Sequence, residues 1–392
     1  MTLPLETDAR VQASNRESAS LLELALLFLR LGTIAFGGPP AHIAMMEDEL
    51  VARRGWLTRE QFLDFLGAAN LIPGPTSTEL AIYVGRVQAG WPGLLVAGGC
   101  FILPSSIMVA ALAWAYIRYG SLPQLAGALY GIKPVVIALI VLAVVKLAGT
   151  AVKSLWLAVL GAMAVLAFAL EANEILVLAG GGFLAGCAYR LRYGRKEKTM
   201  PALLAVSGIS VGAAASAFSL SALFLVFLKI GAILFGGGYV LIALLRSNLV
   251  ARLGWISEAQ LLDAVAIGQV TPGPISTAAT FIGYILGGFP GAVVATVAMF
   301  LPAFFFVAIS GPLIPNLRRS PLAGAVLDGV NVAALALITV VAWQLFRAAV
   351  VDWITLAMAG GSLLLLARYR VNSALLVLGG AAIGAAKLWF HF

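Results

Sequence analysis

The stretch NLIPGPTST, residues 70–78, interrupts an apolar segment that is otherwise suited to a membrane helix. In lipid a chain must satisfy its own backbone hydrogen bonds, and non-helical backbone is tolerated only where protein or a water-filled cavity surrounds it. Pro-Gly-Pro recurs at residues 272–274, and Ser276 and Thr277 follow it. The two stretches therefore predict two helices that are broken inside the membrane, each at a buried or wet position.

The composition indicates an integral membrane protein. Of the 392 residues, 61% are hydrophobic and 11% are charged, whereas a soluble domain is about half apolar. The formal net charge of +8 is explained by Lys and Arg that collect in cytoplasmic loops, so it predicts no nucleic-acid site. Two cysteines and two histidines are too few for a metal cluster or a disulfide framework, and we expect no metal and no cofactor.

The chain repeats itself at a spacing of 199 residues. This offset aligns FGG at 36–38 with FGG at 235–237, and the two Pro-Gly-Pro motifs with each other. It also aligns the run 50–64, which contains a Gly-Trp turn, with 249–263. Apolar composition alone gives scattered Leu and Ala matches but not aligned Trp, Asp and Pro-Gly-Pro, and so the chain consists of two homologous halves.

The repeat divides the chain into five parts. Residues 1–20 are polar, lack the apolar region of a signal peptide, and are expected to form a cytoplasmic tail. The first transporter repeat is then 21–189, a basic cytoplasmic linker is 190–201, an extra transmembrane segment is 202–218, and the second repeat is 219–392.

Each half is predicted to hold six apolar segments that cross, or nearly cross, a bilayer. The segments are 21–46, 62–85, 93–117, 125–145, 155–170 and 175–189 in the first half, and 220–245, 261–286, 291–309, 322–346, 353–367 and 374–389 in the second. With the extra segment the fold is an all-α polytopic membrane protein of about thirteen crossings.

An odd number of crossings turns the second half upside down in the membrane. Loop charges support this, because the turn between the fifth and sixth segments has Glu171 and Glu174 in the first half but Arg368 and Arg370 in the second. Inverted repeats with interrupted helices are the architecture of many secondary transporters. The alternatives are twelve or fewer crossings with re-entrant broken helices, or, without segment 202–218, parallel halves.

The broken helices have the features of an anion site. Pro75 and Pro274 are suited to the first turn of a following half-helix, whose N-terminus directs free N–H groups and a positive dipole end into the break. The predicted substrate-binding residues are Gly37, Gly38, Pro39, Asn70, Pro73, Gly74, Pro75, Thr76, Ser77, Thr78 and Lys133 in the first half, and Gly236, Gly237, Gln269, Pro272, Gly273, Pro274, Ser276 and Thr277 in the second.

Each of these features also has a purely structural interpretation. A proline in a membrane helix often produces only a kink, and paired glycines allow helices to pack closely. Lys133 in the fourth segment, and Lys229 in the eighth, could attract an anion or simply extend toward an interface. Two matched Pro-Gly-Pro motifs, each followed by hydroxyl residues, favour the binding interpretation.

Four ionisable residues are candidates for proton coupling, because such groups inside membrane segments are costly and usually functional. They are His42, Glu79, Asp64 and Asp263. The first two are replaced by Leu and Ala in the second half, which would make the halves chemically unequal. Both aspartates follow Gly-Trp turns near a membrane boundary, where helix capping or an Arg partner is the alternative.

The sequence resembles the chromate ion transporter (CHR) family in its long, two-domain form. The resemblance is carried by FGGPPAHIAMMEDELVARRGWL, LIPGPTSTELAIYVG and AGWPG with FILP in the first half, and by FGGGYVLIALL, LGWIS and TPGPISTAATFIGY in the second. It implies a multi-pass protein of the bacterial inner membrane that exports chromate, and it implies that the Gly-Gly-Pro and Pro-Gly-Pro regions matter for function. The second glycine motif is Gly-Gly-Gly, so Pro39 has no counterpart there.

The expected function is secondary transport of a tetrahedral oxyanion, not enzymatic catalysis. The chain lacks a P-loop motif, and we expect an ion gradient, with the proton as coupling ion, to drive transport. Chromate comes from the resemblance alone, since helix N-termini and hydroxyls would hold sulfate equally well. A sulfate or general oxyanion carrier, working by uptake or exchange, and a channel stay open. A membrane enzyme acting on a lipid phosphate is the remote alternative, because no acid/base set recurs near Pro-Gly-Pro. The oligomeric state is left open, and a homodimer is one possibility.

Overall fold

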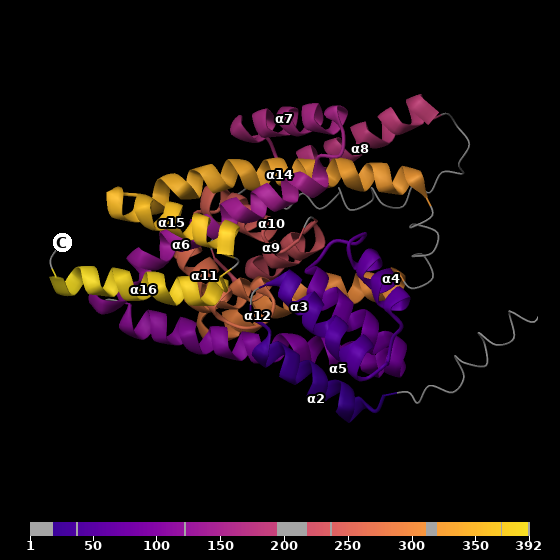
Figure 1. Cartoon of the computed structure of the whole chain (residues 1–392), viewed down its shortest axis with the longest axis horizontal. Helices are drawn as coiled ribbons and strands as arrows, with labels where there is room; N and C mark the ends of the chain where they lie inside the picture. The colour runs from indigo at the N-terminus through magenta and orange to yellow at the C-terminus, as the bar shows by residue number, and fades with distance from the viewer. Residues whose placement is uncertain are drawn as a thin grey trace, which may run out of the picture.

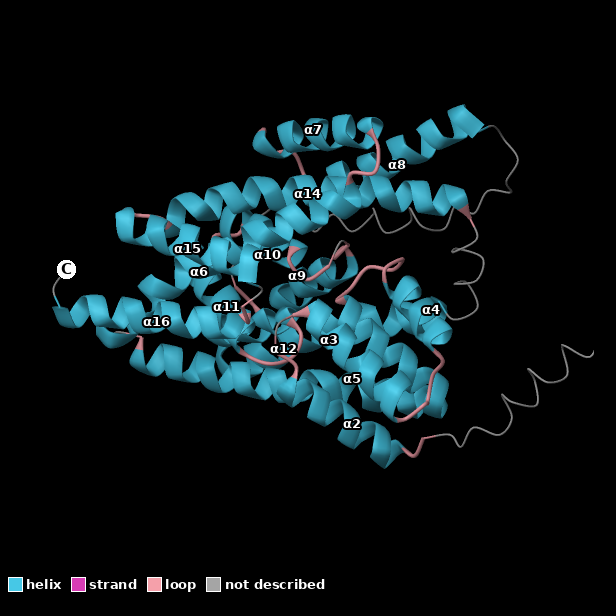
Figure 2. Cartoon of the chain, viewed as in Figure 1, coloured by secondary structure: helices cyan, strands magenta, loops and turns pink. Residues whose placement is uncertain are grey.

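A computed structural model describes residues 19–36, 38–120, 123–193, 218–235, 237–310, 320–369 and 371–390. Within these ranges the chain forms helices and connecting loops and contains no strand (Figure 2), which confirms the all-α prediction. Most of the linker 190–201 and of the predicted extra segment 202–218 lies outside the described residues. The count of thirteen crossings and the inversion therefore stay predictions.

The two halves show the same order of elements. In the first half these are α2 (Leu21–Ile34), α3 (Pro39–Glu47), the π-helix η1 (Asp48–Arg53), α4 (Arg59–Ala69), α5 (Thr76–Tyr119), α6 (Pro123–Ala151), α7 (Leu155–Ala169) and α8 (Glu174–Tyr193). In the second half they are α9 (Leu220–Ala232), α10 (Val240–Leu245), the π-helix η3 (Arg246–Arg252), α11 (Glu258–Val270), the 3-10 turn η4 (Ile275–Thr277), α12 (Ala278–Ser310), α14 (Pro321–Ala349), α15 (Trp353–Tyr369) and α16 (Ser373–Phe390).

The long elements α5 and α12 are each a hairpin of two helices. Non-helical backbone at Ala89 and Gly90 divides α5, and Gly287 and Gly288 divide α12. Residues eight positions apart lie about 12 Å apart in a continuous helix, yet a Cβ on Gly85 would collide with the Gly93 carbonyl. The Thr280 and Thr296 hydroxyls likewise lie 2.7 Å apart across Gly288. Each chain segment therefore reverses at its positive-φ glycine.

These reversals make the helices beside the breaks short. The first arm of α5, residues 76–88, is about 20 Å long at 1.5 Å per residue, which is less than the roughly 30 Å of a bilayer core. Elements long and apolar enough to span are Thr76–Tyr119, Gly127–Ala151, Glu174–Tyr193, Ile275–Ser310 and Pro321–Ala349. The molecule thus combines full spans with half-length helices.

The last helices of each half pack on the other half. α7 and α8 pack against α14, and α15 and α16 pack against α6 (Figure 1). Small residues allow the close approach: Gly181 of α8 meets Gly329 of α14, and Gly380 of α16 meets Gly131 of α6. Since 329 follows 131 by 198 and 380 follows 181 by 199, the two exchanges are equivalent.

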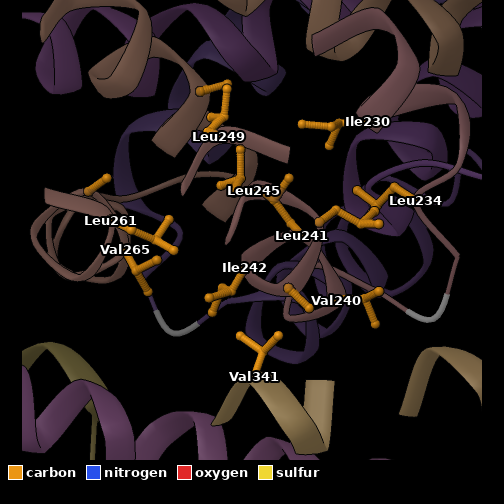
Figure 3. Packing of buried hydrophobic residues seen from close by; sticks show 14 of the residues in the cluster. Ile230, Leu234, Val240, Leu241, Ile242, Leu245, Leu249, Leu261, Val265 and Val341 are labelled. Atoms are coloured by element: carbon orange, nitrogen blue, oxygen red, sulfur yellow. The ribbon is translucent and has the colours of Figure 1, made fainter. Parts of the chain in front are cut away.

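The broken helices of the second half form the centre of the protein. All six residues of α10 are buried, and Figure 3 shows Leu241, Leu245 and Leu249 gathered with side chains of α9 and α11. The end of α16 lies at the left end of the long axis, whereas α2 starts in the right-hand half of the molecule (Figure 1). That placement is the one that termini on opposite membrane faces would need.

Candidate functional site

The break predicted at residues 70–78 is present, and a second break, which was not predicted, interrupts the segment 21–46 that was expected to form one crossing. α2 ends at Ile34 and α3 begins at Pro39, while α4 ends at Ala69 and α5 begins at Thr76. Pro75 is the N-cap of α5, one position before the first turn where the sequence placed it, and its carbonyl accepts hydrogen bonds from the Thr78 and Glu79 N–H groups. The helix N-terminus that the sequence predicted therefore points into the break.

The breaks of the two halves meet through a pair of equivalent hydrogen bonds. The Gly74 N–H donates to the Leu234 carbonyl over 2.8 Å, and the Gly273 N–H donates to the Ala35 carbonyl over 2.9 Å. Leu234 follows Ala35 by 199 positions, so each Pro-Gly-Pro binds the end of the first helix of the other half. Gly273 has φ +89, a left-handed conformation that side chains disfavour.

A cavity of about 420 Å³ lies beside the first Pro-Gly-Pro. Five of the predicted binding residues line it: Pro39, Asn70, Gly74, Thr76 and Gly237. Its other side is formed by α6, the connection that follows it, and α14, through Leu147, Thr150, Ala151, Lys153, Asp328, Asn331 and Leu335. The second Pro-Gly-Pro does not line this cavity, and so the two breaks contribute unequally.

Equivalent hydroxyl groups behind the cavity wall also have different hydrogen-bond partners in the two halves. Ser77 pairs with His42 Nδ1 over 3.2 Å, whereas its counterpart Ser276 finds no partner in the described part of the chain, because Leu241 replaces the histidine. Conversely, Thr277 pairs with Ser105 over 3.0 Å, whereas Thr78 has no partner among the same residues. Buried hydroxyl groups normally form hydrogen bonds, so the missing hydrogen bonds mark the positions where the two halves differ in chemistry.

The four proton-coupling candidates have different surroundings. His42 is buried and engages both ring nitrogens, with Nε2 3.0 Å from the Ala35 carbonyl. Asp263 lies 3.3 Å from the Lys133 ammonium and accepts a hydrogen bond from Tyr116 over 2.9 Å. Glu79 is fully buried, and neither carboxyl oxygen has a partner within the described residues.

The remaining predicted residues that the structure describes do not line the cavity. Asp64 lies on α4, away from the cavity lining. Lys133 is paired with Asp263, and Lys229 with Glu174, so neither cation faces the cavity. One group is buried around the second Pro-Gly-Pro: Gln269, Pro272, Gly273, Pro274, Ser276 and Thr277. Gly37 and Gly236 lie outside the described residues.

The two halves are also packed differently against the long helices. α11 packs against α6, α14 and α16, and the Asp263 to Lys133 ion pair holds it there. The main packing partner of α4, its counterpart, is α5 alone, and the cavity occupies the space between the end of α4 and α14. Packed helices therefore fill the space beside the second break, whereas the space beside the first break holds the cavity.

The sequence did not predict Lys153 and Asp328, which lie at the mouth of the cavity. Their charged atoms are 2.6 Å apart, and the lysine side chain is 60% exposed. Among the described residues that line the cavity, Lys153 is the one with a positive charge. The available signal was Asp328 itself, a carboxylate inside the apolar segment 322–346.

Comparison with known proteins fits this architecture. The model of the family described as "Chromate transporter" matches the chain twice, over residues 22–186 and 221–385. The chain belongs to the chromate transporter family. The two matches begin 199 residues apart, which is the spacing of the internal repeat, and a member of this family with several spanning helices is a multi-pass membrane protein.

Several relatives are similar over nearly the whole chain. The chromate transport protein of Cupriavidus metallidurans is 34% identical, over 97% of this chain and 96% of its own length. A probable chromate transport protein of Synechococcus elongatus is 31% identical, over 94% and 96%. The chromate transport protein of Pseudomonas aeruginosa is 33% identical, over 85% and 82%. No solved structure matches the chain.

Proposed function

We propose that this chromate transporter family member is a secondary transporter that exports chromate, and that the oxyanion occupies the cavity beside the first Pro-Gly-Pro. The observation that carries the proposal is the meeting of a helix N-terminus and the Thr76 hydroxyl around one cavity at the junction of the repeats. The Lys153 ammonium, which pairs with Asp328, lies at the edge of the same cavity and can exchange this partner for the anion. Helix N-termini and ammonium groups both favour anions.

The direction follows from the charge of the substrate. Moving one elementary charge through a potential of 100 mV is worth about 2.3 kcal/mol, and about twice that for a dianion. Since the cell interior is negative, the potential drives chromate outward without any hydrolysis of ATP. Export therefore needs a carrier that releases the anion on the far side, and two repeats of related structure around one cavity supply such an arrangement.

Gradient-driven uptake of labelled chromate into inverted membrane vesicles tests the proposal. Vesicles that carry the protein should accumulate chromate when the lumen is positive, and excess sulfate should inhibit little. Absence of chromate flux contradicts the proposal. Equal competition by sulfate would instead assign a general oxyanion carrier, and flux that never saturates would assign a channel.

Replacing Lys153 with alanine should weaken chromate binding at the mouth of the cavity. We expect the KM for chromate to rise about fivefold at low salt, because a charge contact of this kind contributes on the order of 1 kcal/mol, and to rise less at high salt. The matched control is Lys146→Ala, which removes an exposed lysine of α6 that does not line the cavity. An equal rise in KM for both variants would show that Lys153 acts only through general surface charge.

A further inference from the structure

Glu79 is a carboxyl group in the middle of the protein that has nothing to bind. Its side chain is fully buried, and neither oxygen has a hydrogen-bond partner within the described residues. Buried polar groups are almost always paired, and an isolated buried carboxylate is very costly. The neighbouring Thr78 hydroxyl is also buried, and it too has no partner in the ranges that the structure describes. The two groups together form an unsatisfied polar site in the first turn of α5.

The site lies directly behind the wall of the cavity. Gly74 lines the cavity, and a Cβ built on this glycine would lie 2.9 Å from the Glu79 carboxyl carbon. A single glycine residue therefore separates the carboxyl group from the space assigned to the oxyanion. At this distance, and inside the protein, an ionised Glu79 would repel a dianion strongly, whereas a protonated Glu79 would not.

No described charge compensates an ionised Glu79. On α5 itself, Arg86 stacks on Trp91, and Tyr83 pairs with Ser310. Arg118 lies in the last turn of α5, at the opposite end of that element from Glu79. The ionisable groups on the elements packed against α5 have partners or are exposed. On α2, Arg30 pairs with Glu49, and Glu23 caps its own helix. On α3 and α4, His42 bonds Ser77 and Ala35, Glu47 pairs with Arg59, Asp64 has a partner and Glu60 is exposed. On α11, Asp263 binds Lys133 and Glu258 binds Arg246. α12 and η4 contain no Asp, Glu, Lys or Arg.

We propose that Glu79 must hold a proton before the oxyanion can occupy the cavity, and that each oxyanion therefore crosses the membrane together with one proton. The proton binds the carboxylate on the side where the anion enters, and it leaves where the anion is released. Because Ala278 takes the place of Glu79 in the second half, one carboxyl group serves both repeats. This inference depends on the proposed transport function and adds its coupling ion. A dianion that leaves with one proton carries one net negative charge outward, so the membrane potential drives its export with the energy of one charge instead of two.

Proteoliposomes that contain the purified full chain and a pH-sensitive dye in the lumen test the coupling. Chromate is added outside, the potential is clamped with potassium and valinomycin, and chromate and proton entry are recorded together. The wild type should acidify the lumen by about one proton per chromate. Glu79→Gln, which keeps the shape of the side chain, should carry chromate without acidification and lose the dependence of flux on external pH. Glu60→Gln, at an exposed carboxylate on α4, should behave as the wild type.

Each of the other possible results supports or overturns a particular part of the inference. Absence of chromate flux in the wild type would overturn the transport function itself, whereas chromate flux without protons would overturn only the coupling. Unchanged acidification in Glu79→Gln would mean that the proton enters on hydrogen chromate, and would overturn the role of Glu79. If Glu79→Gln folds but carries nothing, Glu79→Asp decides: proton-coupled flux in this variant supports the inference, and its absence contradicts it.

Discussion

Gly273→Ala is expected to reduce chromate flux at least about tenfold, because a side chain in the left-handed region costs roughly 1–2 kcal/mol before any collision is counted. The added methyl group would also lie 2.7 Å from the Ser105 Cβ, against which the glycine packs. The backbone would have to move, and the Gly273 N–H would lose the Ala35 carbonyl. Flux in vesicles, normalised to the amount of inserted protein, measures the effect.

Gly361→Ala is the matched control for this change. Gly361 lies on α15, and nothing approaches within 4 Å of a Cβ built there. Alanine favours a helix over glycine by up to about 1 kcal/mol, so this variant should insert and transport normally. If Gly273→Ala transported as well as Gly361→Ala, the paired hydrogen bonds between the two breaks would not matter for transport.

Glu174→Gln is expected to destabilise the protein by about 3–5 kcal/mol, the usual effect of breaking a buried ion pair. Glu174 of α8 lies 2.8 Å from the Lys229 ammonium of α9, and both side chains are less than one-tenth exposed. The same lysine donates to Asn248, and the second glutamate oxygen accepts from Ser247. Thermal unfolding in detergent, followed by tryptophan fluorescence, measures the loss.

A double-mutant cycle with Lys229→Met separates the pair from its surroundings. Removing both charges leaves no uncompensated ion, so the double variant should recover much of the stability that each single variant loses. Asp48→Asn provides the control, because the Asp48 pair with Arg53 is exposed on both sides and is worth about 1 kcal/mol or less. Additive losses in the cycle would show that the two charges do not stabilise each other.

The breaks and the repeat could be predicted from sequence because their causes are local. Proline removes a backbone donor and glycine permits positive φ, so Pro-Gly-Pro predicts an interruption without knowledge of its neighbours. The same holds for the 199-residue spacing. The partner of each charged residue could not be predicted this way: Lys229 meets Glu174, which is 55 positions away, and Lys133 meets Asp263 on the other half.

The cavity could not be predicted from sequence either, because its lining comes from distant parts of the chain. Its lining residues Lys153 and Asp328 are 175 positions apart, and the lysine is adjacent to a helix end where a solvated charge is ordinary. Their approach depends on α14 packing against α6, a contact between the halves that no local pattern encodes. Sequence also treated the two Pro-Gly-Pro motifs as equal, whereas burial of the second one follows from the dense packing of α10 and α11.

The exchange of helices between the halves sets an order of events during synthesis at the membrane. α6 is made early, but the face that carries Gly131 is covered by Gly380 and Gly384 of α16, which is synthesised long after α6. Until then this face is open to lipid or to other nascent helices. A premature stop codon within α16 would therefore leave the Gly131 face of α6 uncovered, although the first half of the chain would be complete in sequence.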